Sequence, residues 1–390
     1  MRQPDALVDL LEGLQSRQQD MLEMLGKFVT SESPSRDPAR LAATANLIAE
    51  HGKRLLGVEP QRGGTDASPV LRWDLAGLDS QSGPVLLLAH LDTVWPAATI
   101  DRWPFTVAED HASGPGAFDM KAGLVQALFA LAALTATGLQ RPPVILLVTS
   151  DEEIGSPSGR GLIEEAARGA AAVLVLEASA EGRLKVARKG VGNYWLRVTG
   201  RAAHAGLEPE NGINALTAAA QLVLAVEAIA DPQLGTTITP TLAQAGSAQN
   251  TVPAEASIAI DVRAVTVDEQ RRVDNALRAM QSSTGASVKV EGGTNRPPLE
   301  EAAARGLLER AQHSAKRCGL PPLGWTRVGG GSDGNFTAAL GVPTLDGLGA
   351  VGAGAHAEGE YVLASAMPAR AALLAGLITE LRYKEAVHEA

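Results

Sequence analysis

Residues 84–92 read PVLLLAHLD, a short and continuous apolar run that ends in a histidine and an aspartate. Two similar runs follow at 144–149 (VILLVT) and 172–176 (AVLVL), and a stretch of helical period at 120–137 separates the first two. Runs of five or six apolar residues separated by helices are typical of parallel strands that are buried on both faces. The sequence therefore predicts an α/β core, with a mostly parallel sheet sandwiched by helices.

The pattern changes at about residue 190, where polar and apolar residues begin to alternate. We expect half-exposed strands at 193–199, 236–246, 254–264 and 287–291, and helices near 211–229 and 266–284. This βαββαβ order is that of a ferredoxin-like domain, with its helices on one face of an antiparallel sheet. We predict a catalytic domain in two parts, 1–189 and 295–390, and an inserted dimerisation or lid domain at 190–294.

The outer segments complete the predicted core. Leucines at spacings of three and four make the first seventy residues mostly helical in pattern. After the inserted domain we expect a helix at 300–318, a glycine-rich turn at 329–334, a short strand at 342–345 and a final helix at 365–383.

Composition excludes several classes of protein. The 390 residues carry a net charge of −10 and only 3% aromatics, which argues against a nucleic-acid partner. No apolar run approaches the roughly 18 residues of a membrane span, and the first residues (MRQPDALVDLLEG) lack the apolar region of a signal peptide. The single cysteine excludes an internal disulfide. We therefore expect a cytoplasmic protein without membrane association.

Metal-ligating side chains follow each predicted core strand. His90 and Asp92 end the first run, Glu152 and Glu153 the second, and Glu177 the third. Because ligands bind at the carboxyl ends of strands in open α/β sheets, we expect these groups to converge.

Two further donors lie outside those strands: Asp119 before the central helix and His356 near the end of the chain. His90, Asp119, Glu153, Glu177 and His356 could share two divalent ions if one carboxylate bridges them. Mixed oxygen and imidazole donors favour zinc, with cobalt or manganese as alternatives. Any one of these residues alone is more often an ordinary surface or hydrogen-bonded group, so the prediction depends on all of them together.

Two acidic residues are expected beside the metals rather than on them. Asp92 lies only two positions from His90, so we expect it to orient the imidazole. If the backbone is extended at Glu152 and Glu153, their carboxylates point apart. One of them could then bind metal while the other stays free as a general base, and the resemblance described next implies that Glu152 is the base.

Six segments resemble the co-catalytic zinc peptidases: LLLAHLDTVWP (86–96), GPGAFDMKAG (114–123), TSDEEIGS (149–156), VLEAS (175–179), AAHAG (202–206) and AHAEGEYV (355–362). That family includes glutamate carboxypeptidase, aminoacylase, acetylornithine deacetylase and succinyl-diaminopimelate desuccinylase. The chain looks most similar to glutamate carboxypeptidase, through GGGSDGNF (329–336) and LEAS (176–179). The resemblance implies that His90 and Glu177 hold one zinc, that Glu153 and His356 hold the other, and that Asp119 bridges them.

The resemblance also implies roles for residues of the inserted domain. That domain forms a homodimer in the family, and His204 would reach across to the partner's site and polarise the scissile carbonyl. Asn250, Arg263 and Arg296 match positions that bind the substrate's carboxylate, a task that suits a planar guanidinium.

These inferences predict a two-zinc hydrolase that releases a C-terminal amino acid, preferably glutamate, from N-acyl amino acids or short peptides. A general N-acyl-amino-acid deacylase is the main alternative. Ser332 lies in a Gly-x-Ser-x-Gly pattern, and with Asp346 and His356 it suggests a remote serine-hydrolase alternative. A non-catalytic binding protein is the remaining alternative.

Overall fold

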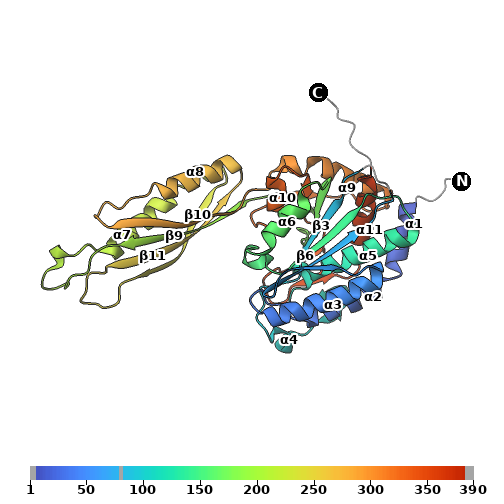
Figure 1. Ribbon diagram of the computed structural model, residues 1–390, viewed down its shortest axis with the longest axis horizontal. Coiled ribbons are helices and arrows are strands. Elements are labelled where there is room, and N and C mark those ends of the chain that lie inside the picture. Colours follow the sequence, from blue (N-terminus) through green and yellow to red (C-terminus); the bar gives the residue numbers. More distant parts are fainter. Residues whose placement is uncertain (1–5, 79–81, 383–390) are drawn as a thin grey trace, which may run out of the picture. The chain divides into compact units, whose positions relative to one another are not determined.

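The computed structural model describes residues 6–78 and 82–382 (Figure 1). The chain divides into two compact units. Unit 1 comprises Met1–Ala187, Glu301–Val328 and Ser332–Ala390, and unit 2 comprises Arg188–Glu300 and Gly329–Gly331. The second boundary lies six residues beyond the predicted one, and the last strand of unit 2 ends at Arg296, two residues beyond the predicted boundary.

A six-stranded mixed sheet forms the centre of unit 1, and its strand order is β1-β2-β6-β3-β7-β14. Its strands are β1 (Gln61–Thr65), β2 (Ser68–Leu75), β3 (Val85–His90), β6 (Val144–Thr149), β7 (Ala172–Val175) and β14 (Thr344–Leu345). The three predicted runs form β3, β6 and β7, and β3 is parallel to both of its neighbours. The predicted mostly parallel α/β core is confirmed.

Helices cover both faces of this sheet (Figure 1). One face packs mainly against α1 (Ala6–Gln15), α2 (Gln18–Thr30), α3 (Pro38–Leu56), α5 (Ala122–Thr137), α9 (Arg305–Arg317) and α11 (Ala366–Glu380). The other face packs against α6 (Gly159–Ala167) and α10 (Gly334–Ala339). Leu87 points into the first layer, and Leu86 and Leu88 point into the second. Burial on both sides explains why β3 is apolar at every position before His90, since each buried leucine contributes about 1.5–3 kcal/mol.

The central helix α5 carries the most apolar segment of the chain. The helical stretch Ala117–Thr137 is long and apolar enough to cross a membrane by composition alone, but 83% of its most apolar window is buried inside unit 1. It is therefore a core helix, and it ends at Gly138, which adopts a left-handed conformation (φ 65°).

Two smaller sheets in unit 1 are not predicted by the sequence. β4 (Thr106–Ala108), β5 (His111–Ser113), β15 (Gly352–Ala353) and β16 (Tyr361–Leu363) form one, and β8 (Leu184–Arg188) and β13 (Trp325–Val328) form the other. The hairpin of β1 and β2 interrupts the mostly helical pattern that the sequence indicates for the first seventy residues. The helix ends instead at Gly57, which is left-handed (φ 70°), and β1 contains two glycines that disfavour a helix.

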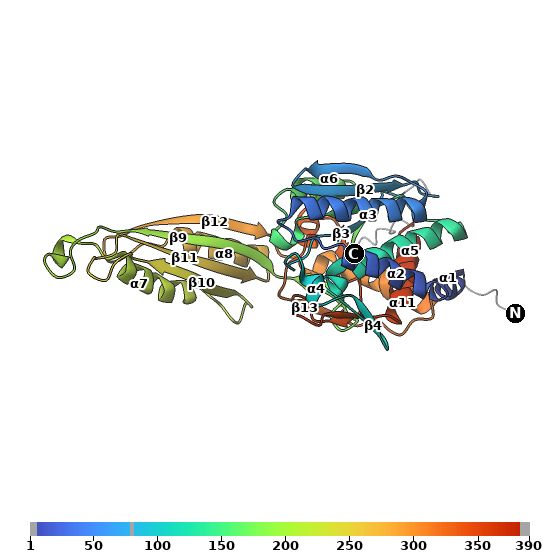
Figure 2. The ribbon, with the colours of Figure 1, turned by 90° about the horizontal axis from the view of Figure 1, so that it is seen from below.

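Unit 2 is an antiparallel four-stranded sheet in the order β10-β11-β9-β12 (Figure 2). Its strands are β9 (Gly190–Thr199), β10 (Thr237–Ala245), β11 (Glu255–Ala264) and β12 (Ser287–Arg296), and its helices are α7 (Ala215–Glu227) and α8 (Val267–Arg278). Both helices contribute to one buried cluster with the sheet. The predicted βαββαβ order is confirmed, although α8 ends six residues earlier than expected.

Candidate metal centre

The metal-ligating residues of unit 1 gather at the carboxyl edge of its sheet. His90 is the last residue of β3, Glu177 lies two residues beyond β7, and Glu153 lies four residues beyond β6. Asp119 lies in the turn Ala117–Lys121 before α5. His356 lies in the loop between β15 and β16. The fold thus brings together five residues that span more than 260 positions of the sequence.

Two groups of ligand atoms form around Asp119. His90 Nε2 lies 3.4 Å from Asp119 Oδ1 and 3.4 Å from Glu177 Oε1. His356 Nε2 lies 3.4 Å from Asp119 Oδ2 and 3.2 Å from Glu153 Oε2. In each group the ligand atoms lie within 4.8 Å of one another. Asp119 therefore presents one carboxylate oxygen to each group, which is the geometry of a bridging ligand.

Several of these atoms are buried without satisfying their hydrogen-bonding capacity. His90 Nε2, Asp119 Oδ1 and Glu153 Oε1 have no hydrogen-bond partner of acceptable geometry among the described residues. An unsatisfied buried polar atom costs about 1–3 kcal/mol, and more when it is charged. Coordination to a cation would satisfy all three, so the residues fit a metal site.

The carboxylates change the protonation of both imidazoles. Burial lowers the pKa of His90, but contacts with Asp119, Asp92 and Glu177 outweigh it and raise that pKa well above its usual value. Asp119 and Glu153 raise the pKa of His356 to about 10. The neighbouring carboxylates therefore favour the protonated form of each imidazole in the absence of a cation, and metal binding would release a proton because a ligating histidine is neutral.

Asp92 is fully buried, and it interacts with other residues in addition to His90. The backbone carbonyl of Asp92 lies 3.0 Å from His90 Nδ1, whereas its Oδ1 lies 3.4 Å away. Its carboxylate accepts hydrogen bonds from the backbone N–H groups of Glu152 and Glu153, both at 3.2 Å, and from the Ser35 hydroxyl at 2.7 Å. The sequence analysis expected Asp92 only to orient His90. It did not predict the hydrogen bonds that the Asp92 carboxylate accepts from the backbone of the two glutamates.

The backbone at the two glutamates is not extended, and this expectation was wrong. Glu152–Ile154 form a single 3₁₀ turn that ends at Gly155 (φ 90°). Successive side chains in a 3₁₀ turn diverge by about a third of a turn, so the two carboxylates still point apart. Glu153 faces His356, and Glu152 remains 8% exposed.

The remaining site residues lie in unit 2, in two pairs at opposite ends of its sheet. Arg263 and Arg296 both stand opposite Val191 on β9. Asn250 lies beside His204, because the Asn250 carbonyl accepts a 2.9 Å hydrogen bond from the Ala205 N–H. Eight positions of β9, from 191 to 199, separate the ends, or about 26 Å at 3.3 Å per residue. Arg263 forms an ion pair with Asp261, in which the arginine Nε lies 2.8 Å from the aspartate Oδ1.

The structure contradicts the serine-hydrolase alternative. Ser332 is fully buried and donates its hydroxyl proton to Asp346 at 2.6 Å. His356, which would have to activate that serine, instead directs Nε2 to Asp119 and Glu153. A catalytic triad needs the histidine between the other two residues.

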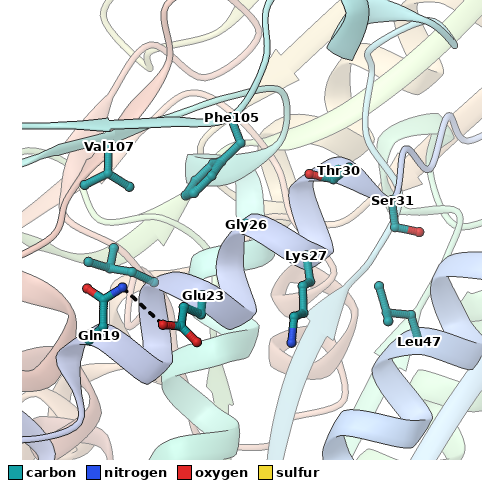
Figure 3. A pocket seen from close by; sticks show the side chains of 10 residues that line it. Gln19, Glu23, Gly26, Lys27, Thr30, Ser31, Leu47, Phe105 and Val107 are labelled. Carbon is teal, nitrogen blue, oxygen red and sulfur yellow. Dashed lines mark hydrogen bonds between the residues drawn. The ribbon is translucent and has the colours of Figure 1, made fainter.

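A cavity of about 680 Å³ lies elsewhere in unit 1, between α2, α3 and the segment that leads into β4 (Figure 3). Its lining is mostly apolar and includes Leu22, Leu47, Phe105 and Val107. It contains neither group of metal-ligating atoms. We therefore place the chemistry at the sheet edge rather than in this cavity.

Comparison with known proteins identifies a family and several relatives of this chain. The model of peptidase family M20/M25/M40 matches residues 86–380. Carboxypeptidase G2 from Pseudomonas sp. (strain RS-16) is 33% identical over 382 residues, which cover 95% of this chain and 92% of that protein. One of the subunits of the p-aminobenzoyl-glutamate hydrolase from Escherichia coli (strain K12) is 45% identical over 87 residues, covering 22% and 20%.

A solved structure shares the fold. The aminopeptidase PepT from Bacillus cereus ATCC 10987 superposes with a TM-score of 0.77 at 22% identity, covering 95% of this chain and 99% of that one. At this identity the likeness shows the fold alone.

Proposed function

This chain belongs to peptidase family M20/M25/M40, and from that premise we propose that it is a two-zinc hydrolase that cleaves an amide bond next to a free α-carboxylate. The family consists of metal-dependent hydrolases that act on peptides and acyl-amino acids. The observation that carries the proposal is the position of Asp119, whose two oxygens each lie 3.4 Å from a different imidazole.

His90 and Glu177 would hold the first ion, and Glu153 and His356 would hold the second, with Asp119 between them. Imidazole and carboxylate donors in such a mixture suit zinc best, with cobalt or manganese as alternatives. When bound, the ions polarise the scissile carbonyl and lower the pKa of water.

Glu152 would act as general base. Its carboxylate accepts a proton from the attacking water and then returns it to the leaving nitrogen, which departs as a neutral amine. The rigid turn that carries Glu152 supports this role, because Asp92 holds the backbone N–H groups of both Glu152 and Glu153. A base held in this way loses little orientation during the reaction.

The guanidinium groups of Arg263 and Arg296 would recognise the substrate's free carboxylate, and the amide of Asn250, which lies beside His204 at the other end of the sheet, would reach it from a second copy. An arginine offers two parallel donors that match the two oxygens of a carboxylate. One relative supports a glutamate-type substrate: p-aminobenzoyl-glutamate hydrolase, by the substrate in its name.

We also propose a homodimer formed through unit 2. Strand β10 lies at an edge of the sheet, and among the residues that the structure describes it pairs with β11 alone. Beside that edge three leucines are exposed: Leu216 and Leu224 of α7 at 51% and 70%, and Leu242 of β10 at 60%. Clustered exposed apolar side chains mark protein interfaces, and a second copy of the same edge would cover them.

A dimer would also explain the position of His204. Its Nδ1 accepts hydrogen bonds from the Gly206 and Leu207 N–H groups at 3.1 Å, so the ring proton lies on Nε2, available to a carbonyl oxygen. Within one copy, the eight positions of β9 between Val191, which stands opposite Arg263, and Thr199 already span about 26 Å, and His204 lies five residues beyond Thr199. A site that uses both residues would therefore take His204 from the second copy.

A cytoplasmic location belongs to the proposal as well. The one cysteine of the chain, Cys318, is buried and forms no disulfide. A chain that needs no disulfide suits a reducing compartment.

A substrate panel tests the proposed function. The protein is stripped with a chelator, reloaded with zinc, and assayed for release of free amino acid from N-acyl glutamate, aspartate and methionine and from dipeptides. We expect activity only in the reloaded protein and fastest release of glutamate. Equal rates across the panel would favour a general deacylase, and no release from any substrate by zinc-loaded protein would contradict the proposal.

A further inference from the structure

A buried glutamate beside the metal centre has no part in the chemistry described above. Glu360 lies four residues after His356 and immediately before β16. It is 1% exposed, and neither carboxylate oxygen has a hydrogen-bond partner of acceptable geometry among the described residues. Burying a carboxylate in this way is costly unless something nearby offsets the charge.

The Glu360 carboxylate faces the turn that presents Asp119. The backbone N–H groups of three consecutive residues, Gly116, Ala117 and Phe118, act on it and lower its pKa. They fall short of full hydrogen-bond geometry, so the contact is chiefly electrostatic. Gly116 is left-handed (φ 74°), and successive N–H groups around a left-handed residue form a concavity that attracts anions.

The same glutamate is anchored through its backbone. Its carbonyl accepts a 2.8 Å hydrogen bond from the Ser113 hydroxyl, and its N–H donates to the Ala357 carbonyl at 3.1 Å. Glu360 therefore connects the loop that carries His356 to the turn that carries Asp119. Those two residues belong to the same group of ligand atoms.

Charge explains why a carboxylate rather than an apolar group occupies this position. Burial raises the pKa of Glu360 to about 8, and the nearby Asp119 carboxylate contributes to the rise. The Asp119 carboxylate thus disfavours the ionised form of Glu360 in the metal-free chain. Cations at the neighbouring site would reverse that effect, since each negative charge then attracts them.

We propose that Glu360 is a positioning residue for the metal centre: its buried carboxylate holds the Gly116–Phe118 turn so that Asp119 can present one oxygen to each metal position. This inference rests on the proposed two-metal function. It adds a residue that does not touch the substrate and acts through Asp119.

Metal binding to the stripped protein tests this role without any assay of activity. The variants are E360Q, which keeps the shape and removes the charge, and E360D, which keeps the charge but shortens the side chain. Zinc affinity and stoichiometry are measured by calorimetry, and folding by circular dichroism and the melting temperature. We expect both variants to fold and to bind zinc about 10–100-fold more weakly, the usual effect of losing a group that supports a metal ligand.

Two control variants lie close to the same residue. S113A removes the hydrogen bond to the Glu360 carbonyl but leaves the carboxylate in place. E358Q changes an exposed neighbour that pairs with Arg102 at 2.6 Å, away from the turn. We expect both controls to bind zinc within about threefold of the unmodified protein, because neither touches the Gly116–Phe118 turn.

Three outcomes would overturn the inference. Wild-type zinc affinity in E360Q and E360D would do so, and a lower melting temperature with unchanged affinity would reduce Glu360 to a purely structural residue. Equal losses in S113A and E360Q would place the effect in the loop rather than in the carboxylate. If the unmodified protein itself bound no zinc, the proposed function would fail and this inference with it, so the two failures are distinguishable.

Discussion

Asp119 is the residue on which the candidate metal centre depends, because each of its oxygens faces a different imidazole. In D119N one oxygen becomes an amide nitrogen that cannot bind a cation, so the bridge is lost. We expect the variant to retain at most one zinc per chain and to lose about 100-fold or more in turnover, corresponding to about 3 kcal/mol of transition-state stabilisation. Elemental analysis and rate measurements check this, and two tightly held ions in D119N would contradict the bridging role.

Glu152 and Glu153 are neighbours in sequence but have different expected roles. E152Q should keep both metals and lose about 10²–10⁴ in turnover, since it removes a general base. E153Q is the matched control, and we expect it to lose metal because Glu153 lies 3.2 Å from His356 Nε2. Metal content and initial rates, measured on the same preparations, distinguish the general-base role of Glu152 from the metal-binding role of Glu153. A fully active E152Q would show that another group accepts the proton.

At the scale of the element, the loop between β15 and β16 determines where His356 lies. His356 itself is left-handed (φ 63°), and Gly354 (φ 89°) and Gly359 (φ 90°) flank it. A left-handed non-glycine residue costs about 1–3 kcal/mol and persists only when its surroundings hold it. The strained position therefore indicates that the loop is shaped for its ligand rather than for stability.

Two glycines of this loop provide a matched pair of substitutions. A Cβ at Gly354 would lie 2.9 Å from the Glu360 Cα, whereas a Cβ at Gly359 would meet no atom within 4 Å. Both G354A and G359A should lose about 1–2 kcal/mol of stability from backbone strain. Only G354A should also weaken zinc binding, because it must displace the loop. Melting curves and zinc titration check this, and equal zinc affinities would show that the loop absorbs the clash.

At the scale of the whole molecule, the proposed dimer can be disrupted without touching the metal centre. The double variant L224E/L242E places two charges on the exposed edge of unit 2. We expect a monomer by analytical ultracentrifugation, with zinc content retained and turnover lost. L78E, which changes a leucine of unit 1 that is 57% exposed, should leave the assembly unchanged. A dimeric double variant would place the interface elsewhere.

Mixing two inactive variants tests whether His204 acts across that dimer. E152Q keeps His204, and H204A keeps Glu152, so a mixed dimer contains one complete site. We expect each variant alone to be about 10²–10³-fold impaired or worse, and remixing to restore up to about a quarter of the unmodified activity by statistical pairing. Mixtures no more active than their components would remove the role of His204 across the dimer.

Much of this protein could be predicted because the relevant signals are local. Strands β3, β6 and β7 are continuous apolar runs, and each is followed within a few residues by a metal-ligating side chain. Residue type and position at the end of a strand were therefore enough to select His90, Glu153 and Glu177. The sheet of β4, β5, β15 and β16 could not be found in this way, since its short strands pair across about 250 residues. Glu360 was missed for the same reason.

The sequence by itself determined the mostly parallel core and the βαββαβ insertion and selected five candidate donors, because periodicity and residue chemistry are properties of short segments. Only the tertiary structure decided which donors share a position, that the Asp92 carboxylate caps the turn of Glu152 and Glu153, and that Glu360 faces the turn before Asp119. Those relations depend on distances between segments remote in the chain, and packing alone sets such distances.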